Sequence, residues 1–314
     1  MLGERWVLGV TEAARAGVLG ATSLVGACLL PLLMQANWQV TAYSRRADGQ
    51  AGDGVMWRRL PLPELRPSPT QRFLMSGKSI PDWICVAPIW VLPDYFDLLE
   101  AHGARRVVVL SSTSRFTKDD SSDPEEQAVA LRLAEAEAHV QAWAENRGVE
   151  WVILRPTLIY GLGRDKNIAE IARFIRRFGF FPVLGKAEGL RQPIHAGDVA
   201  GACVAALQAP AAANHAYNIS GGEALAYRDM VARVFAALGR PPRLLPVPLP
   251  AFRVAVALLR CLPRYRHWSA AMAKRMNRDL VFDHAEAAQD LDFRPRAFVL
   301  ATGDLPNTVP LRRT

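Results

Sequence analysis

The stretch GVLGATSLVG, residues 17–26, has the composition of a turn that binds phosphate groups. Small residues recur at every third position, as Gly20, Ser23 and Gly26, between a short apolar run and a helical run. The first amides of a helix have no intrahelical partner and the helix dipole is positive there, so a phosphate is stabilised at this end. We therefore expect these residues to hold a pyrophosphate: Gly20, Ala21, Thr22, Ser23, Leu24, Val25 and Gly26.

The turn departs from the usual glycine patterns at two positions. Thr22 occupies the second glycine of the tight GxGxxG form, and Ser23 occupies the middle glycine of the relaxed GxxGxxG form. Serine is small, and its hydroxyl can donate to a phosphate oxygen. The relaxed form therefore still predicts a nucleotide site. A strand, turn and helix without a ligand stays as the alternative, because glycine-rich turns are common.

The run QVTAYSRR ends with groups that could recognise the adenosine end of a dinucleotide. An acidic residue here would accept a bond from the ribose 2′-hydroxyl and would repel a 2′-phosphate. Ser44, Arg45 and Arg46 would instead bind that phosphate through charge-assisted hydrogen bonds. NADP is therefore favoured and NAD stays as the alternative. Two solvated surface arginines would give the same pattern.

These residues need a framework, and the first half of the chain predicts one. Short apolar runs such as AGVLGA, QVTAYSRR, DWICVAPIWV and RRVVVLSSTS alternate with helical stretches. Strands that are apolar on both faces and alternate with helices are typical of a parallel sheet covered by helices. The fold class predicted is therefore α/β, a doubly wound Rossmann-type parallel sheet with a smaller C-terminal lobe.

One long helix is predicted after the acidic stretch that follows Lys118. Ser122 or Asp123 is a helix-starting residue, Pro124 suits the first turn, and Gly148 is a typical stop. The run EWVILRP should then form a further strand. We expect an N-terminal extension over 1–15, a dinucleotide-binding domain over 16–157 and a mainly substrate-binding lobe over 158–314. Segments near 194–220 should return to the first domain.

Composition limits the partners of the chain. Its 314 residues are 50% hydrophobic and 22% charged, and the net charge of +8 favours anionic partners. Four scattered cysteines without a CxxC pair indicate neither a disulfide framework nor a metal site, and they predict a reducing, cytoplasmic setting. No apolar run reaches the about 18 residues of a membrane span. The dispersed basic residues match no nucleic-acid-binding module.

Five stretches together resemble the extended short-chain dehydrogenase/reductase family, which includes nucleotide-sugar epimerases and dehydratases. They are GATSLVG, VVVLSSTS, LRPTLIYG, RQPIHAGDVA and AYNISGGEALAYRDM, in the order in which that family has them. The resemblance covers roughly residues 16 to 300. It implies a nicotinamide dinucleotide in the first lobe and a substrate, often a nucleotide sugar, beneath the second.

The resemblance also implies roles for individual residues. Thr113 matches the hydroxyl residue that hydrogen-bonds the reacting oxygen, and Arg191 matches an arginine that binds the substrate's diphosphate. We expect Asn167 to hold the substrate together with Arg191. Arginine suits a diphosphate because its planar fork grips two oxygens, although Arg191 could instead anchor a loop to a carbonyl. His195 belongs to the same motif, and we interpret it as structural. The remaining residues implied near the cofactor are Ala87, Pro88, Ser111, Arg155 and Pro156.

The proton donor that this family ordinarily uses is absent. The family has Tyr-x-x-x-Lys on a long helix, where the spacing of four puts both side chains on one face. Between Lys118 and Trp151 the chain has neither tyrosine nor lysine, and Arg132 keeps a charge but cannot donate a proton near neutral pH. Other groups could supply it, although each is more often an ordinary loop or surface residue: Lys118, Tyr160, Asp119, Asp120 and Asp165.

Two functions follow from these observations. The first is an NAD(P)-dependent oxidoreductase or epimerase/dehydratase-like enzyme acting on a nucleotide sugar or a similar anionic metabolite. The second is a catalytically silent NAD(P)-binding regulator or assembly protein, which would explain the missing tyrosine and lysine directly. The resemblance suggests a homodimer. The basic run AFRVAVALLRCLPRYRHW could contact a membrane surface, but a lobe helix over the cleft would look the same.

Overall fold

A computed structural model describes residues 13–45, 54–60, 79–119, 121, 123–248, 251 and 275–307. Most of the predicted N-terminal extension lies outside these residues, as does most of the basic run that begins at Ala251. Arg264, Arg266 and Lys274 lie outside them too.

The centre of the molecule is a seven-stranded sheet in which every neighbouring pair is parallel, in the order β11-β6-β5-β4-β1-β2-β3. This is the doubly wound Rossmann-type order that the sequence predicts. Its strands are β1 (Arg15–Leu19), β2 (Gln39–Ser44), β3 (Met56–Arg59), β4 (Asp82–Cys85), β5 (Arg106–Leu110), β6 (Glu150–Pro156) and β11 (His215–Ile219).

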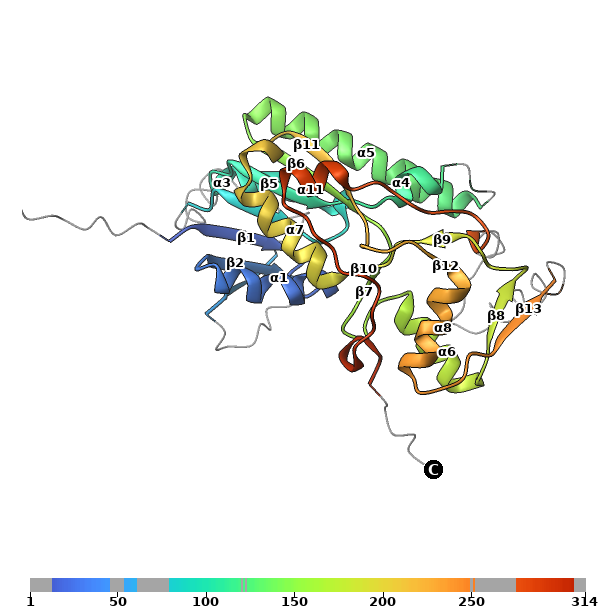
Figure 1. Cartoon of the computed structure of the whole chain (residues 1–314). Coiled ribbons are helices and arrows are strands. Elements are labelled where there is room, and N and C mark those ends of the chain that lie inside the picture. The colour runs from blue at the N-terminus through green and yellow to red at the C-terminus, as the bar shows by residue number, and fades with distance from the viewer. Residues whose placement is uncertain are drawn as a thin grey trace, which may run out of the picture.

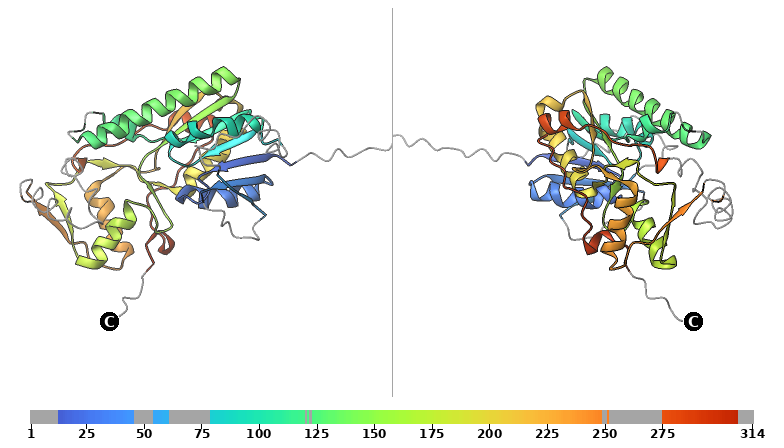
Figure 2. Two further views of the ribbon diagram at one scale, coloured as in Figure 1. Left: turned by 180° about the vertical axis from the view of Figure 1, so that it is seen from behind. Right: turned by 45° about the vertical axis from the view of Figure 1, so that its right-hand side comes forward.

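Helices cover both faces of the sheet, because its central strands are apolar on both sides (Figure 1). One face packs against α1 and α7, and the other against η1, α3 and α5. Figure 2 shows α5 as the long green helix that runs along the sheet towards the second lobe. The bounds of these elements are α1 (Leu24–Gln35), η1 (Ile89–Tyr95), α3 (Phe96–Ala101), α4 (Ser114–Thr117), α5 (Pro124–Arg147), α7 (Ala196–Gln208) and η2 (Pro210–Ala212).

Helix α5 begins and ends where its sequence predicts. The Asp123 side chain accepts a hydrogen bond from the Glu125 amide at 3.0 Å, and Pro124 is the first helical residue. At the other end Gly148 adopts φ 62°, the left-handed conformation that a glycine favours. The start and the stop of the helix are therefore both fixed by local chemistry.

The second lobe has its own apolar cluster around α6 and α8. Helix α6 packs its buried face against this cluster, while β8 and β13 form a small parallel pair beside it. The elements of this part are β7 (Ile159–Tyr160), α6 (Ile168–Phe178), β8 (Phe181–Leu184), β9 (Leu190–Arg191), β10 (Ile194–His195), β12 (Leu225–Ala226), α8 (Tyr227–Ala237), β13 (Leu244–Val247), α11 (Ala285–Asp290) and η4 (Thr302–Asp304).

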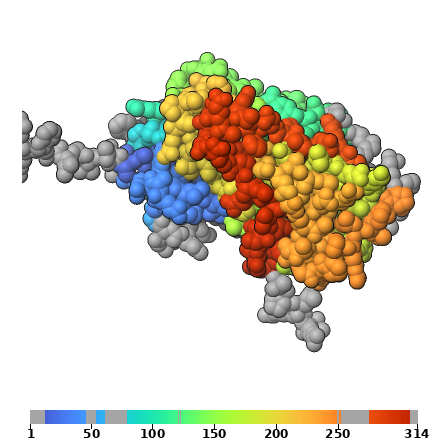
Figure 3. All heavy atoms as spheres, viewed as in Figure 1, coloured from blue at the N-terminus to red at the C-terminus, as the bar shows by residue number. Residues whose placement is uncertain are grey.

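The chain crosses between the two lobes more than once. After β10 it forms α7, which packs on one face of the sheet, and β11, which pairs with β6 at the sheet edge. Figure 3 shows residues 275–307, in red, lying across the surface between the yellow α7 and the orange elements of the second lobe. The carboxyl end of the sheet thus faces both the second lobe and this final segment.

Two details of the sheet differ from the sequence expectation. The run DWICVAPIWV forms only a short strand, β4, because Pro88 is followed by the 3₁₀ turn η1. The structure also contains β3, which the sequence pattern does not predict. Its residues are half-buried or exposed, because this strand lies at the edge of the sheet. Edge strands lack the continuous apolar run that marks the central ones.

Candidate functional site

The turn between β1 and α1 has the geometry of a phosphate site. Gly20 has φ 80°, and a Cβ on it would lie 2.5 Å from the backbone nitrogen of Ala87. A Cβ on Gly26 would overlap the carbonyl oxygen of Ala21. Both positions therefore require glycine, and the tips of β1 and β4 approach closely at the point where the strand order reverses. Open α/β sheets bind their ligands at such a point.

Ser23 is the N-cap of α1. Its Oγ accepts a hydrogen bond from the Gly26 amide at 3.0 Å, so it satisfies one of the amides that begin the helix. Its own hydroxyl hydrogen is left to donate, and the side chain of Thr22 is exposed beside it. The residues of this turn therefore fit a pyrophosphate despite the serine.

Beside the end of β2, where the sequence predicts the adenosine contacts, lies a cation that the sequence pattern does not indicate. Ser44 ends β2 and is buried, Arg45 is exposed, and Arg46 lies outside the described residues. The parallel register pairs Ser44 with Arg59, which is the exposed last residue of β3. Arg58 points to the opposite face and hydrogen-bonds the Tyr43 hydroxyl. The two arginines that end GVMWRR are the one signal in the sequence for this cation. Their position depends on β3, a strand that the sequence pattern does not predict.

The tips of β5 and β6 bring Thr113 against Pro156. The Thr113 amide and its Oγ1 both donate to the Pro156 carbonyl, at 3.1 and 3.2 Å. Thr113 is buried, and it lines the cavity described below. Its hydroxyl must rotate away from Pro156 before it can donate to a substrate, whereas its lone pairs are available to accept.

Two residues predicted near the cofactor, Ser111 and Arg155, bind a buried glutamate of α5. Glu137 is fully buried and accepts from Ser111 Oγ at 2.5 Å. Arg155 Nη2 donates to it at 2.7 Å, and Arg115 completes the ion pair. The guanidinium groups of both arginines also lie against the ring of Phe116. This cluster joins β5, β6 and α4 to α5.

Helix α5 contains neither tyrosine nor lysine, and part of the face that it buries is apolar. Val129 and Leu133 are four residues apart on one face of the helix, and Leu133 is buried in the core beside η1 and β5. Arg132 lies over the ring of Trp90, with its guanidinium carbon 4.6 Å from the ring centroid. No proton donor of the usual kind is present on this helix.

A cavity of about 610 Å³ lies between the sheet tips and the second lobe. It brings together Thr113, Lys118, Asn167 and Arg191, four residues that the sequence singles out. Cations, carboxylates and aromatic rings share its wall. Its charged lining residues are Lys118, Lys166, Arg191, Arg275, Glu126 and Glu170.

Lys118 and Arg191, two predicted residues of the cavity, differ in burial. Lys118 is half-buried, and burial lowers the pKa of its amine from the ordinary value. Arg191 is almost fully buried, and its guanidinium donates to the carbonyls of Leu190, Arg278 and Arg275, two of them at 2.7 and 2.8 Å. Burial lowers the pKa of Arg191 to about 10. Its donors are thus engaged by backbone, which is the loop-anchoring alternative that the sequence left open.

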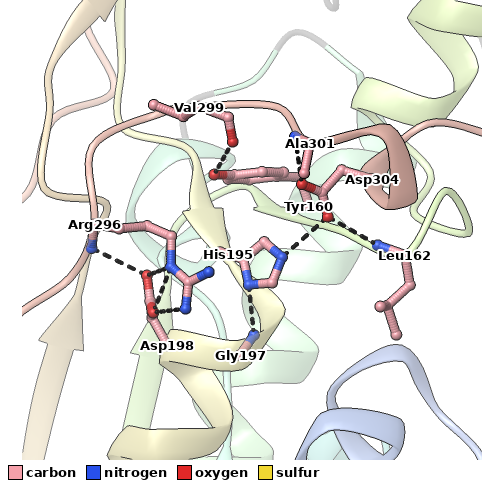
Figure 4. A network of polar contacts seen from close by, with 9 residues as sticks. All are labelled: Tyr160, Leu162, His195, Gly197, Asp198, Arg296, Val299, Ala301 and Asp304. Atoms are coloured by element: carbon pink, nitrogen blue, oxygen red, sulfur yellow. Dashed lines mark hydrogen bonds and ion pairs between the residues drawn. The ribbon is translucent and has the colours of Figure 1, made fainter.

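Tyr160 lies outside this cavity lining, in the network of Figure 4. It is fully buried, its hydroxyl donates to the Val299 carbonyl at 3.3 Å, and burial raises its pKa to about 12. In the same network His195 Nδ1 accepts from the Gly197 amide, and Nε2 donates to Asp304 at 3.1 Å. These contacts hold the final segment against β7, β10 and α7.

The sequence offers three aspartates as proton donors, Asp119, Asp120 and Asp165, and the two that the structure describes differ in burial. Asp165 is buried and caps α6, because its Oδ1 accepts from the Asn167 and Ala169 amides. Asp119 is exposed, and Asp120 lies outside the described residues. Within the described ranges no group of three His, Cys, Asp or Glu side chains could hold a metal. No helix among those residues is long and apolar enough to cross a membrane.

The comparisons with known proteins agree with this geometry. Residues 94–220 match the model of the NAD dependent epimerase/dehydratase family. The UDP-glucose 4-epimerase of Vibrio cholerae is 29% identical over 139 residues, which are 44% of this chain and 42% of that protein. The chain is therefore similar to the extended short-chain dehydrogenase/reductase family, in keeping with the resemblance of its sequence motifs.

The relatives of the chain differ in what their names say they do. One relative is the mitochondrial NADH dehydrogenase [ubiquinone] 1 alpha subcomplex subunit 9 of Arabidopsis thaliana, 25% identical over 174 residues, 52% of this chain and 43% of that protein. The matches to these two relatives thus span less than half of their lengths. The UDP-glucuronic acid 4-epimerase of Bacillus cereus, solved in complex with NAD, has a TM-score of 0.66 at 14% identity, over 92% of this chain and 95% of that one. That likeness confirms the fold.

Proposed function

We propose that the chain is an NAD(P)-dependent oxidoreductase or epimerase/dehydratase-like enzyme that acts on a nucleotide sugar or a similar anionic metabolite. The cavity at the carboxyl end of β5 and β6 is the main support, because it joins the Thr113 hydroxyl to a half-buried amine, Lys118. Four cationic side chains and two carboxylates line it, so an anionic substrate is favoured there.

Residues 20–26 would hold the pyrophosphate of the dinucleotide. The nicotinamide of that dinucleotide would supply or accept hydride when bound. The fit rests on the close approach of Gly20 to Ala87 and on the cap that Ser23 provides. Arg45 and Arg59 would face the adenosine ribose from neighbouring strands and would favour NADP. The preference rests on these cations, with NAD as the alternative.

Lys118 would exchange the proton with the reacting oxygen. An amine with an ordinary pKa is a poor acid near neutral pH, but burial of Lys118 lowers its pKa towards the range in which proton exchange is efficient. Thr113 would orient the same oxygen after its hydroxyl turns from Pro156. In this proposal Lys118 and Thr113 together perform the proton exchange for which α5 has no tyrosine and lysine.

The cations of the wall would orient the anionic part of the substrate. Lys166 is exposed and lies beside Asn167 at the start of α6, so both side chains can reach an anion in the cavity. Arg191 would contribute mainly by fixing the segment that contains Arg275 and Arg278.

Lys118→Arg tests the proton assignment, because arginine keeps the charge but does not release a proton near neutral pH. Purified protein is first tested for binding of NADPH and NADH by fluorescence, and then for turnover of a panel of sugar nucleotides. We expect the variant to bind cofactor normally and to lose about 100-fold or more in turnover. Thr113→Val should also reduce turnover with little change in cofactor affinity. Unchanged turnover in Lys118→Arg would contradict the assignment.

Arg45→Ala and Arg59→Ala test the cofactor preference. Each should weaken NADP more than NAD, since only NADP has the 2′-phosphate. Arg58→Ala is the matched control, because Arg58 is the next residue of β3 and faces the other side of the sheet. Equal losses of NADP and NAD would refute the role of these arginines.

The silent cofactor-binding protein is the second candidate. The apolar pair Val129 and Leu133 on α5 supports it, since neither side chain can take part in proton exchange. A relative named as a subunit of NADH dehydrogenase adds to it. Cofactor binding without turnover of any sugar nucleotide in the panel would favour this candidate over the enzyme.

A further inference from the structure

A second charged cluster lies on the wall of the cavity, and the mechanism above uses only one of its members. Glu126, in the first turn of α5, accepts from Ser121 Oγ at 2.7 Å and forms an ion pair with Arg275 of the final segment. Their side chains are 12% and 21% exposed. Lys118 lines the same cavity just before α5. The cluster therefore brings together three parts of the chain.

The Lys118 backbone is fixed in this cluster. Its amide donates to the Ser114 carbonyl at 3.2 Å, and its carbonyl accepts from the Ser121 amide at 3.3 Å. Ser121 in turn donates its hydroxyl to Glu126. The short loop between α4 and α5 thus fixes the position of the Lys118 backbone relative to Glu126.

The charged groups around Lys118 act in opposite directions. Burial lowers the pKa of its amine most strongly, Glu126 raises it, Arg275 lowers it and Asp123 raises it. Lys166, Glu170 and Arg191 are the other charged groups that line the same cavity. A carboxylate near an ammonium stabilises the protonated form, and a guanidinium stabilises the neutral form.

We propose that Glu126 and Arg275 are opposing positioning residues for the Lys118 amine, Glu126 holding it protonated and Arg275 favouring its neutral form. Their ion pair keeps both charges at fixed places, so the two groups act on the amine in opposite directions. The meaning of this balance for catalysis rests on the proposed function, in which Lys118 exchanges a proton. The balance itself is a property of the protein without substrate.

The titration of Lys118 can be followed without any turnover. Acetic anhydride labels only neutral amines, so the extent of labelling of Lys118 against pH, measured by mass spectrometry, gives the midpoint of its titration. Glu126→Gln should move that midpoint to lower pH, and Arg275→Met should move it to higher pH. Each shift should be on the order of one pH unit. Shifts in the same direction, or no shift in either variant, would overturn the proposal.

Internal and matched controls exclude a general disturbance. Lys166 lines the same cavity and is labelled in the same experiment, so the extent of its labelling reports any general change in access to the reagent. Glu125→Gln removes the neighbouring carboxylate, which is exposed and does not line the cavity, and should leave Lys118 unchanged. Arg275→Lys keeps a cation and should give a midpoint near that of the original protein. Circular dichroism checks the fold of each variant.

The same variants separate this proposal from the proposed function. If Lys118 carries the proton in a reduction, the alkaline limb of the turnover profile should move down in Glu126→Gln and up in Arg275→Met. Labelling midpoints that move in opposite directions support the positioning role even where Lys118→Arg keeps full turnover, because that result would remove only the proton assignment. Labelling midpoints that stay fixed overturn the positioning role whatever the activity.

Discussion

Two glutamates on the same face of α5, about three turns apart, meet cations in different ways. Glu137 is fully buried and is bound by Arg155, Arg115 and Ser111, which come from the tips of neighbouring elements. Glu126 lies on the wall of a cavity, where one arginine pairs with it. The first arrangement satisfies the carboxylate completely and holds the strand tips together. The second leaves a charge whose influence reaches a titratable neighbour.

The contrast explains how α5, which has no tyrosine or lysine, is held in its place. The apolar pair Val129 and Leu133 adds to the core, and Glu137 ties the helix to β5 and β6 through charge. The proton donor of the proposed function, Lys118, lies just before the first turn of the helix. Fold-holding contacts and cavity-facing contacts should therefore respond differently to the same kind of substitution.

Replacing the buried carboxylate should have the largest effect. Glu137→Gln leaves the guanidinium groups of Arg155 and Arg115 without a counter-charge, so the free energy of unfolding should fall by about 3–5 kcal/mol. Urea denaturation followed by circular dichroism measures it. Glu135→Gln is the matched control, because Glu135 is exposed on the same helix. A loss no greater than that of the control would show that the buried pair contributes nothing.

The same substitution in the cavity should cost less. Glu126→Gln should lower the free energy of unfolding by about 1 kcal/mol, because Arg275 is 21% exposed and water can solvate its charge. The measurement is again urea denaturation, beside Glu137→Gln under identical conditions. A loss as large as that of Glu137→Gln would end the distinction between the two glutamates.

The sequence predicts helix α5 but not the contacts that its two glutamates make. Local signals define α5 fully, since Asp123, Pro124 and Gly148 act through their immediate neighbours. The Glu126–Arg275 pair joins residues 149 positions apart, and no local pattern indicates such a contact.

The candidate site shows the same limit. The glycines of residues 20–26 were predictable because their steric requirement lies within one turn and at the adjacent strand tip. Arg59 was not, because its place depends on the register of an edge strand. The contacts of Arg191 depend on the final segment, so the sequence could only leave both of its roles open.

Ser23 tests whether a predicted ligand residue also holds the fold. Ser23→Ala removes the hydroxyl that caps α1 and should cost about 1 kcal/mol, whereas Ser23→Gly should cost only a few tenths. Thermal unfolding of both variants gives the stability, and calorimetry gives their affinity for NADPH. Retained affinity in Ser23→Gly would mean that backbone amides suffice for the pyrophosphate. A much weaker affinity would instead assign a phosphate contact to the Ser23 hydroxyl.

Tyr160→Phe should have the smallest effect and places this residue on the fold-holding side of the contrast. It removes one long hydrogen bond to Val299, so the loss should be about 0.5 kcal/mol, at the low end for such bonds. Because burial raises the pKa of Tyr160 to about 12, its hydroxyl stays protonated through the neutral and mildly alkaline range, and the loss should not vary with pH there. Cofactor affinity and turnover should be unchanged, since Tyr160 lies outside the cavity lining. A fall in turnover with normal stability would instead give Tyr160 a part in the chemistry, and Lys118 would then have to share the proton.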